Sequence, residues 1–170
     1  MFYHFFKKSI LAIFFLTLLL PGNLSAQIID SIYYGWAVHE YESDDGIRQC
    51  YLSSFPAKSD SNHTSERAPH LLITRYARKR TEEVSVYSGY EYKINSGVFI
   101  LVNDIQFKFF TDNETAWLKT PAEDKEVIQM MLRSSVVKVR SDSSVGTYAI
   151  DEYSMKGFDR AYARMKEICK

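Results

Sequence analysis

Alternating apolar and polar residues divide most of the chain into short strands. Residues 33–41 place Trp36 and Val38 on one face, and residues 47–55 place Cys50 and Leu52 together. Further runs of strand character cover residues 71–75, 84–87, 98–102, 105–111, 136–139 and 147–150, and Asn103-Asp104 is a hairpin signal between two of them. The pattern therefore predicts a mainly β fold, an antiparallel β-sandwich or barrel-like sheet.

The loop between the first two runs allows two hairpin registers. A two-residue turn at Asp45-Gly46 pairs Cys50 with Tyr41 and puts Trp36 on the other side of the sheet from Cys50. A three-residue loop that ends with Gly46 in the left-handed conformation pairs residues 36, 38 and 40 with residues 54, 52 and 50. We predict the second register, because it gathers the apolar side chains onto one buried face.

Two amphipathic segments predict short helices. At residues 120–123, Thr-Pro-Ala-Glu combines a capping box with proline at the first helical position, and an apolar stripe then runs to about Ser134. The last helix should span residues 156–168, capped by Ser154. Its apolar face carries Phe158, Ala161 and Cys169, so we expect it to pack on the sheet.

Two polar stretches are candidate interaction surfaces. Residues 56–69 show no apolar periodicity, so we expect a long exposed loop, which includes His63. A basic cluster, placed between two strands, consists of Arg75, Arg78, Lys79 and Arg80. The cluster is either a patch for an anion or a partner, or a solvated loop.

Aromatic residues concentrate between residues 89 and 119. The rings belong to Tyr90, Tyr92, Phe99, Phe107, Phe109, Phe110 and Trp117. Rings of this kind fill a β core, which is the interpretation that we favour, or they line a cavity for a small apolar ligand.

The N-terminal segment has the three parts of a secretory signal peptide. Lys7 and Lys8 precede an apolar run over residues 10–20, and a polar stretch then ends at Ala26. The run is shorter than the roughly 20 residues of a bilayer-spanning helix, although an uncleaved anchor is the alternative. We expect cleavage of residues 1–26, no membrane span afterwards, and a single periplasmic or secreted domain at 27–170.

Cleavage changes the charge and the redox setting of the chain. The mature protein keeps 19 of the 21 basic residues and all 21 acidic ones, a net charge of about −2, so neither nucleic acid nor an anionic membrane surface is indicated as a partner. Cys50 and Cys169 are the only cysteines, and an even count in an exported chain predicts a disulfide. Two buried free thiols are the alternative.

No motif of catalysis or cofactor binding occurs in the sequence. The mature histidines, His39, His63 and His70, lack the spacing of a helical metal pair. Asp151 and Glu152 are neighbours on an extended segment and point to opposite faces, so we expect them only to lead into the last helix. We therefore expect a non-enzymatic protein without cofactors, and a hydrolase with a dispersed site is the remaining enzymatic alternative.

The C-terminal stretch over residues 153–158, followed by Ala161 and Cys169, resembles the signature of the invasion associated locus B family of exported alphaproteobacterial proteins. Further matches, in the same order as in the family, are Trp36, the Cys50 strand, Gly89-Tyr90, Ala116-Trp117, residues 144–147, and Gly157 and Phe158 within the signature. The resemblance implies an all-β core with short helices, a periplasmic or secreted location and, in some pathogenic members, a role in host-cell invasion. Many members carry a cysteine near position 40 and further cysteines later, so this chain resembles a divergent member. The function expected from it is that of an envelope or host-interaction factor with a protein partner.

Overall fold

The structure is a computed structural model that describes residues 28–42 and 46–170. The segment predicted to be a signal peptide lies outside the described residues. The strands are β1 (Ile28–Tyr33), β2 (Trp36–Glu42), β3 (Arg48–Ser54), β4 (Lys58–Ser61), β5 (His70–Tyr76), β6 (Thr81–Tyr87), β7 (Val98–Val102), β8 (Ile105–Asp112), β9 (Thr115–Trp117), β10 (Val136–Asp142) and β11 (Tyr148–Ser154). Helix α1 (Pro121–Met131) lies between β9 and β10, and helix α2 (Phe158–Ile168) follows β11.

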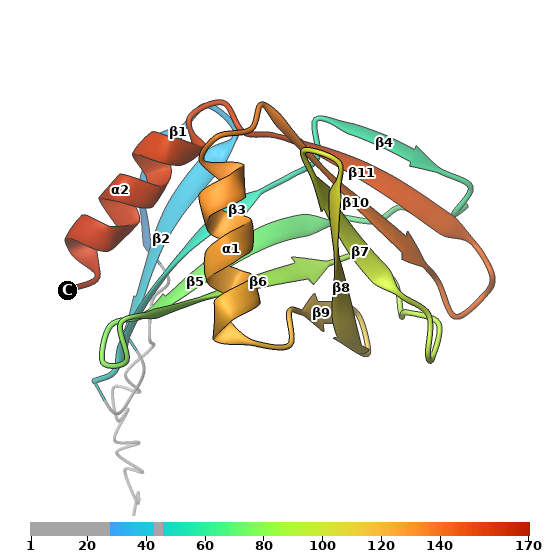
Figure 1. Ribbon diagram of the computed structural model, residues 1–170, viewed down its shortest axis with the longest axis horizontal. Helices are drawn as coiled ribbons and strands as arrows, with labels where there is room; N and C mark the ends of the chain where they lie inside the picture. The colour runs from blue at the N-terminus through green and yellow to red at the C-terminus, as the bar shows by residue number, and fades with distance from the viewer. Residues whose placement is uncertain (1–27, 43–45) are drawn as a thin grey trace, which may run out of the picture.

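The strands form one antiparallel sheet in the order β1-β2-β3-β5-β6-β9-β8-β7-β10-β11-β4. Strand β8 changes partner along its length, because residues 105–109 pair with β7 and residues 110–112 pair with β9. The sheet turns at this strand, and its two parts curve around a shared core (Figure 1). Helix α2 packs on β1, β2 and β3, whereas α1 packs on β6 and β7. The predicted fold class, with the C-terminal helix on the sheet, is confirmed.

The predicted register of the first long hairpin is also confirmed. Strands β2 and β3 pair Trp36 with Ser54, Val38 with Leu52 and residue 40 with residue 50. Gly46 takes the left-handed conformation with φ of 72°, while the other loop residues, 43–45, lie outside the described part. Inward-facing side chains of both strands are buried, as the choice of register required.

Two strand boundaries differ from the prediction. Residues 33–41 are not one strand, because a tight turn at Tyr34-Gly35 pairs Tyr33 with Trp36 and separates β1 from β2. Tyr34 has φ of 56°, a conformation that a tyrosine does not signal in the sequence. The short strand β9 is an additional element without a clear sequence pattern, and Asn113, with φ of 51°, lies in the turn before it.

The stretch 56–69 is not one exposed loop. Residues 58–61 form β4, which pairs with β11 at the edge of the sheet, so that Ser59 lies opposite Asp151. An edge strand with both faces near solvent needs no apolar alternation, and this explains why the sequence pattern does not reveal it. Later in the same stretch, Arg67 turns inward and is nearly buried.

Helix α1 begins as predicted. Thr120 accepts a hydrogen bond from the Glu123 backbone N–H, and the Glu123 carboxylate accepts one from the Thr120 N–H, which completes the capping box. Val127, Ile128 and Met131 are buried on the face toward the sheet.

Helix α2 begins at Phe158, two residues later than predicted, and Ser154 is the last residue of β11 rather than its cap. The residue before the helix is Gly157, with φ of 86°. A Cβ atom at this position would lie 2.6 Å from the Tyr33 carbonyl oxygen. Glycine is therefore required both for the backbone conformation and for the close approach of the helix to the first hairpin.

Candidate functional site

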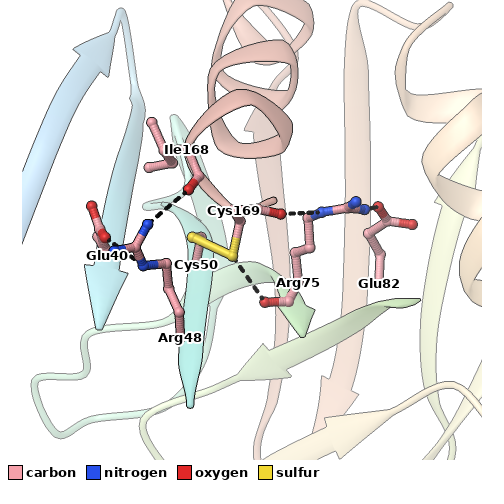
Figure 2. The surroundings of a disulfide bond; sticks show 7 residues. All are labelled: Glu40, Arg48, Cys50, Arg75, Glu82, Ile168 and Cys169. Carbon is pink, nitrogen blue, oxygen red and sulfur yellow. Dashed lines mark hydrogen bonds and ion pairs between the residues drawn. A yellow bond between two sulfur atoms is a disulfide. The ribbon is translucent and has the colours of Figure 1, made fainter. Parts of the chain in front are cut away.

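Cys50 on β3 and Cys169 at the end of α2 form a disulfide (Figure 2). Their Cα atoms are 5.8 Å apart, within the usual range, and both side chains are fully buried. The bond joins the C-terminal end of α2 to β3, the third strand from the β1 edge of the sheet. It confirms the pairing predicted from the cysteine count and the shared helix face.

Arg75 does not belong to an exposed cluster, so that prediction is wrong. It lies on β5 with its side chain 11% exposed, beside the disulfide (Figure 2). Its Nε donates a hydrogen bond to the Cys169 carbonyl oxygen at 3.1 Å, and Nη1 forms an ion pair with Glu82. Arg75 therefore holds the end of α2 and is not available to a partner.

Residues of the family-like signature have structural roles. Trp36 and Phe158 are fully buried with ring centroids 4.8 Å apart, and Trp36 Nε1 donates to the Ser154 carbonyl oxygen at 2.9 Å. Ala161 is also buried in this contact between α2 and the first strands. Together with Gly157, these residues fix where the helix lies on the sheet.

The other signature residues are distributed over the opposite part of the sheet. Gly89 has φ of 72°, and a Cβ atom there would lie 2.9 Å from the Ala68 nitrogen. Tyr90 is buried and bonds to Ser141, while Trp117 is half-buried and stacks on the exposed Phe110. The aromatic segment thus divides between core rings and surface rings.

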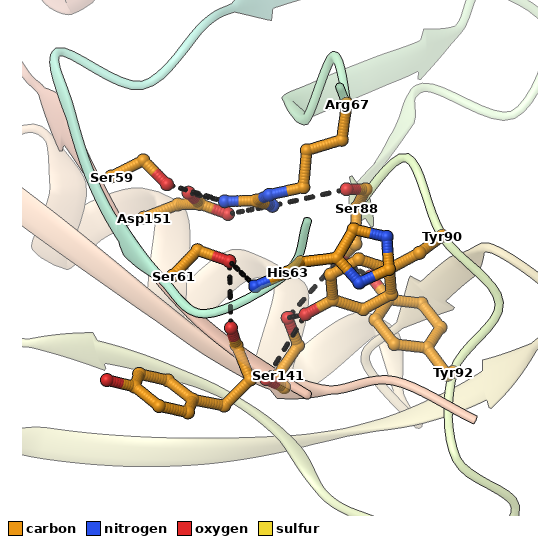
Figure 3. Close-up of polar contacts among 10 residues, drawn as sticks. Ser59, Ser61, His63, Arg67, Ser88, Tyr90, Tyr92, Ser141 and Asp151 are labelled. Carbon is orange, nitrogen blue, oxygen red and sulfur yellow. Dashed lines mark hydrogen bonds and ion pairs between the residues drawn. The ribbon is translucent and has the colours of Figure 1, made fainter. Parts of the chain in front are cut away.

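A buried polar network joins β11 to the segment before β5 (Figure 3). Arg67 forms a bidentate ion pair with Asp151, with N–O distances of 2.6 and 2.9 Å. Arg67 also donates to Ser59 Oγ and to the Ser88 carbonyl oxygen. Sequence reasoning misses this pair, because its members are 84 residues apart and Asp151 resembles an ordinary polar residue before the last helix.

His63, a predicted surface residue, lies against this network. Its Nδ1 is 2.7 Å from Thr147 Oγ1. Its ring lies 5.0 Å from that of Tyr90 (Figure 3). The side chain is half-buried. We therefore assign His63 to the packing of this segment rather than to the contact surface.

The remaining members of the basic cluster are exposed. Arg78, Lys79 and Arg80 occupy the turn between β5 and β6, which we call the basic turn. None of the three forms an ion pair with another described residue. The turn therefore presents three exposed positive charges within three consecutive residues.

The basic turn borders a groove of about 340 Å³ between the two helices. The groove is lined by Arg80, Thr81, Glu82, Pro121, Lys125, Gln129, Tyr162 and Lys166. Burial raises the pKa of Tyr162, and the Glu82 carboxylate adds to the rise, so its hydroxyl stays protonated and can donate a hydrogen bond. The arrangement offers cations and hydroxyl donors to an anion.

The described residues hold no group of three or more His, Cys, Asp or Glu side chains that could bind a metal ion. Across the same residues, no helix is long and apolar enough to cross a bilayer. Comparison of the chain with protein-family models, with curated proteins and with solved structures found no match.

Proposed function

We propose that this chain is an exported protein that acts by binding an acidic partner in the cell envelope or on a host surface, and that the basic turn is its contact surface. The observation that carries the proposal is the set of exposed cations at Arg78, Lys79 and Arg80, which have no ion-pair partner among the described residues. On a chain whose mature net charge is slightly negative, such a cluster favours one defined orientation of an acidic partner.

Export is supported by the signal-like N-terminus and by the Cys50–Cys169 disulfide, since such bonds persist in oxidising compartments. The resemblance to the invasion associated locus B family agrees with both. Intact-mass analysis of the protein recovered from the periplasm or medium should give a chain that begins at residue 27. Recovery of only an uncleaved, membrane-bound chain would contradict export in this form.

Binding is tested by crosslinking and pull-down with the purified protein. A variant with Arg78→Ala, Lys79→Ala and Arg80→Ala should lose the partner, and added salt should weaken capture by the unchanged protein. The matched control replaces Lys93, Lys108 and Arg133 with alanine, because these residues also carry positive charges and lie elsewhere on the chain. A partner retained by the turn variant, or lost equally with the control, would refute the assignment.

A ring-lined groove favours a second candidate function, the binding of a small apolar ligand in the periplasm. It measures about 420 Å³ on the outer face of β3, β5 and β6, and its lining includes Tyr51, Phe55, His70, Leu72 and Tyr87. Phe55 is 60% exposed, which is unusual for a large apolar ring. Native mass spectrometry of the protein with and without Phe55→Ser would detect such a ligand, and its absence from both samples would exclude this candidate.

A further inference from the structure

The groove beside the basic turn carries a net positive charge that the protein leaves unpaired. Arg80, Lys125 and Lys166 line it and form no ion pair within the described residues. Glu82 is the one acidic side chain in the lining, and its carboxylate is engaged by Arg75. Like charges around one hollow repel each other, so an anion placed between them removes an unfavourable interaction as well as adding favourable ones.

Polar groups of the lining complement these charges. Thr81 and Tyr162 supply hydroxyl groups, and Gln129 supplies an amide that can donate hydrogen bonds. Lys125 and Gln129 are one turn apart on α1, as Tyr162 and Lys166 are on α2. The two helices and the start of β6 therefore present the donors.

Two other hollows in the described part of the chain are larger, with volumes of about 690 and 500 Å³, but their charges are mixed, and the ring-lined groove of about 420 Å³ is lined by no lysine, arginine or carboxylate. Lys119 and Asp112 line both of the larger hollows. Glu91 adds a second carboxylate to the larger one, and Glu83 and Asp124 add two more to the smaller one. An anion entering either would meet carboxylates that no arginine neutralises. Charge thus singles out the groove between the helices.

We propose that the groove bordered by Arg80, Lys125 and Lys166 binds the phosphate group of a soluble phosphomonoester. A phosphate dianion interacts with three cations about twice as strongly as a carboxylate monoanion does. Arginine offers a fork of N–H donors that matches phosphate oxygens, and the two lysines act as point charges. The inference goes beyond the proposed function, since it concerns the groove beside the basic turn and a small ligand rather than the turn and its partner.

Calorimetric titration of the purified protein with inorganic phosphate tests the site. We expect a Kd in roughly the millimolar range, and acetate at the same ionic strength should bind at least about tenfold more weakly. The double variant Lys125→Ala/Lys166→Ala should weaken phosphate binding by about tenfold or more. The control Lys58→Ala/Lys108→Ala removes two exposed lysines of β4 and β8 and changes the net charge equally, so it should leave Kd within about twofold. Equal affinity for acetate, or equal losses in both variants, would overturn the proposal.

The carrier of the phosphate is tested with glucose 6-phosphate and with vesicles of phosphatidylcholine that contain phosphatidic acid. Binding of the sugar phosphate supports a soluble ester, whereas binding of the vesicles alone overturns that choice. The pull-down tests the proposed function independently of these titrations. If phosphate binds but no partner is captured, the proposed function is refuted and the phosphate site stands. If a partner is captured through the basic turn but phosphate does not bind, the phosphate site is refuted and the proposed function stands.

Discussion

Removing the Cys50–Cys169 disulfide should lower the free energy of unfolding by about 5 kcal/mol. The bond closes a loop across a sequence separation of 119 residues. In the chain-entropy model, a loop of this length restricts the unfolded chain by roughly 16 cal/mol/K, which is about 5 kcal/mol at 25 °C. A domain of this size has a total stability of roughly 5–15 kcal/mol, so the loss should be a third of the total or more.

The folded state should nevertheless survive the loss of the bond. Arg75 still donates to the Cys169 carbonyl oxygen, and Arg48 Nη1 lies 3.4 Å from the Ile168 carbonyl oxygen (Figure 2). Phe158 still packs on Trp36 at the other end of the helix. Because these contacts remain, the main effect falls on the unfolded state, and a cooperative transition should still be measurable.

Urea unfolding followed by circular dichroism measures the effect in three variants: Cys50→Ala, Cys169→Ala and the double substitution. Each single variant already lacks the bond, so each should lose nearly the whole amount. The double variant should lose only a little more, from the packing of the second sulfur. Single losses that add up in the double variant would refute the reasoning, because they would mean that each sulfur contributes through packing alone.

Three further predictions concern buried groups. Phe158→Ala should cost about 3–5 kcal/mol, because the ring is fully buried against Trp36, and an unchanged melting temperature would contradict this. Asp151→Ala should cost about 3–5 kcal/mol in urea unfolding, since it leaves the nearly buried Arg67 guanidinium without its counter-charge, whereas replacing both residues with apolar ones should cost less. Burial raises the pKa of Asp124 from 3.8 to about 6, although the hydrogen bond that its carboxylate accepts from the Val84 N–H lowers the pKa. The folded chain therefore holds the proton of this carboxyl group more firmly than the unfolded chain does. The free energy of unfolding should therefore fall as the pH rises from about 4 to about 6, and Asp124→Asn should reduce that slope in urea titrations at several pH values.

Local signals in the sequence are sufficient where a feature depends on a few adjacent residues. The capping box at Thr120 and Glu123 determines the start of α1, and Asn103-Asp104 determines the turn between β7 and β8. The register of β2 and β3 follows from one glycine and from the need to bury Trp36 on the same face as Cys50. Each of these depends on backbone conformation or on the period of two along a strand, both of which are local properties.

Features that depend on distant partners are not predictable in the same way. Strand β4 is polar along its whole length, and only its pairing with β11 makes it a strand. Arg67 and Asp151 each look like an ordinary surface charge until the fold brings them together. Arg75 also looks like part of an exposed basic run, although its position on β5 directs it toward the end of α2.

The disulfide and the basic groove are parts of one arrangement. Cys169 follows α2 directly, and Lys166 lies three residues before it, so the bond to Cys50 limits how far Lys166 can move from the sheet. Arg75 holds the same end of the helix through its hydrogen bond to the Cys169 carbonyl oxygen. It also forms an ion pair with Glu82, whose carboxylate would otherwise neutralise positive charge in the groove. The contacts that stabilise the C-terminal helix thus also keep three cations close together and unpaired, a placement that costs the folded protein electrostatic energy. The disulfide offsets this cost because it restricts the unfolded chain. It adds no contact within the groove, so the groove stays open to an anion.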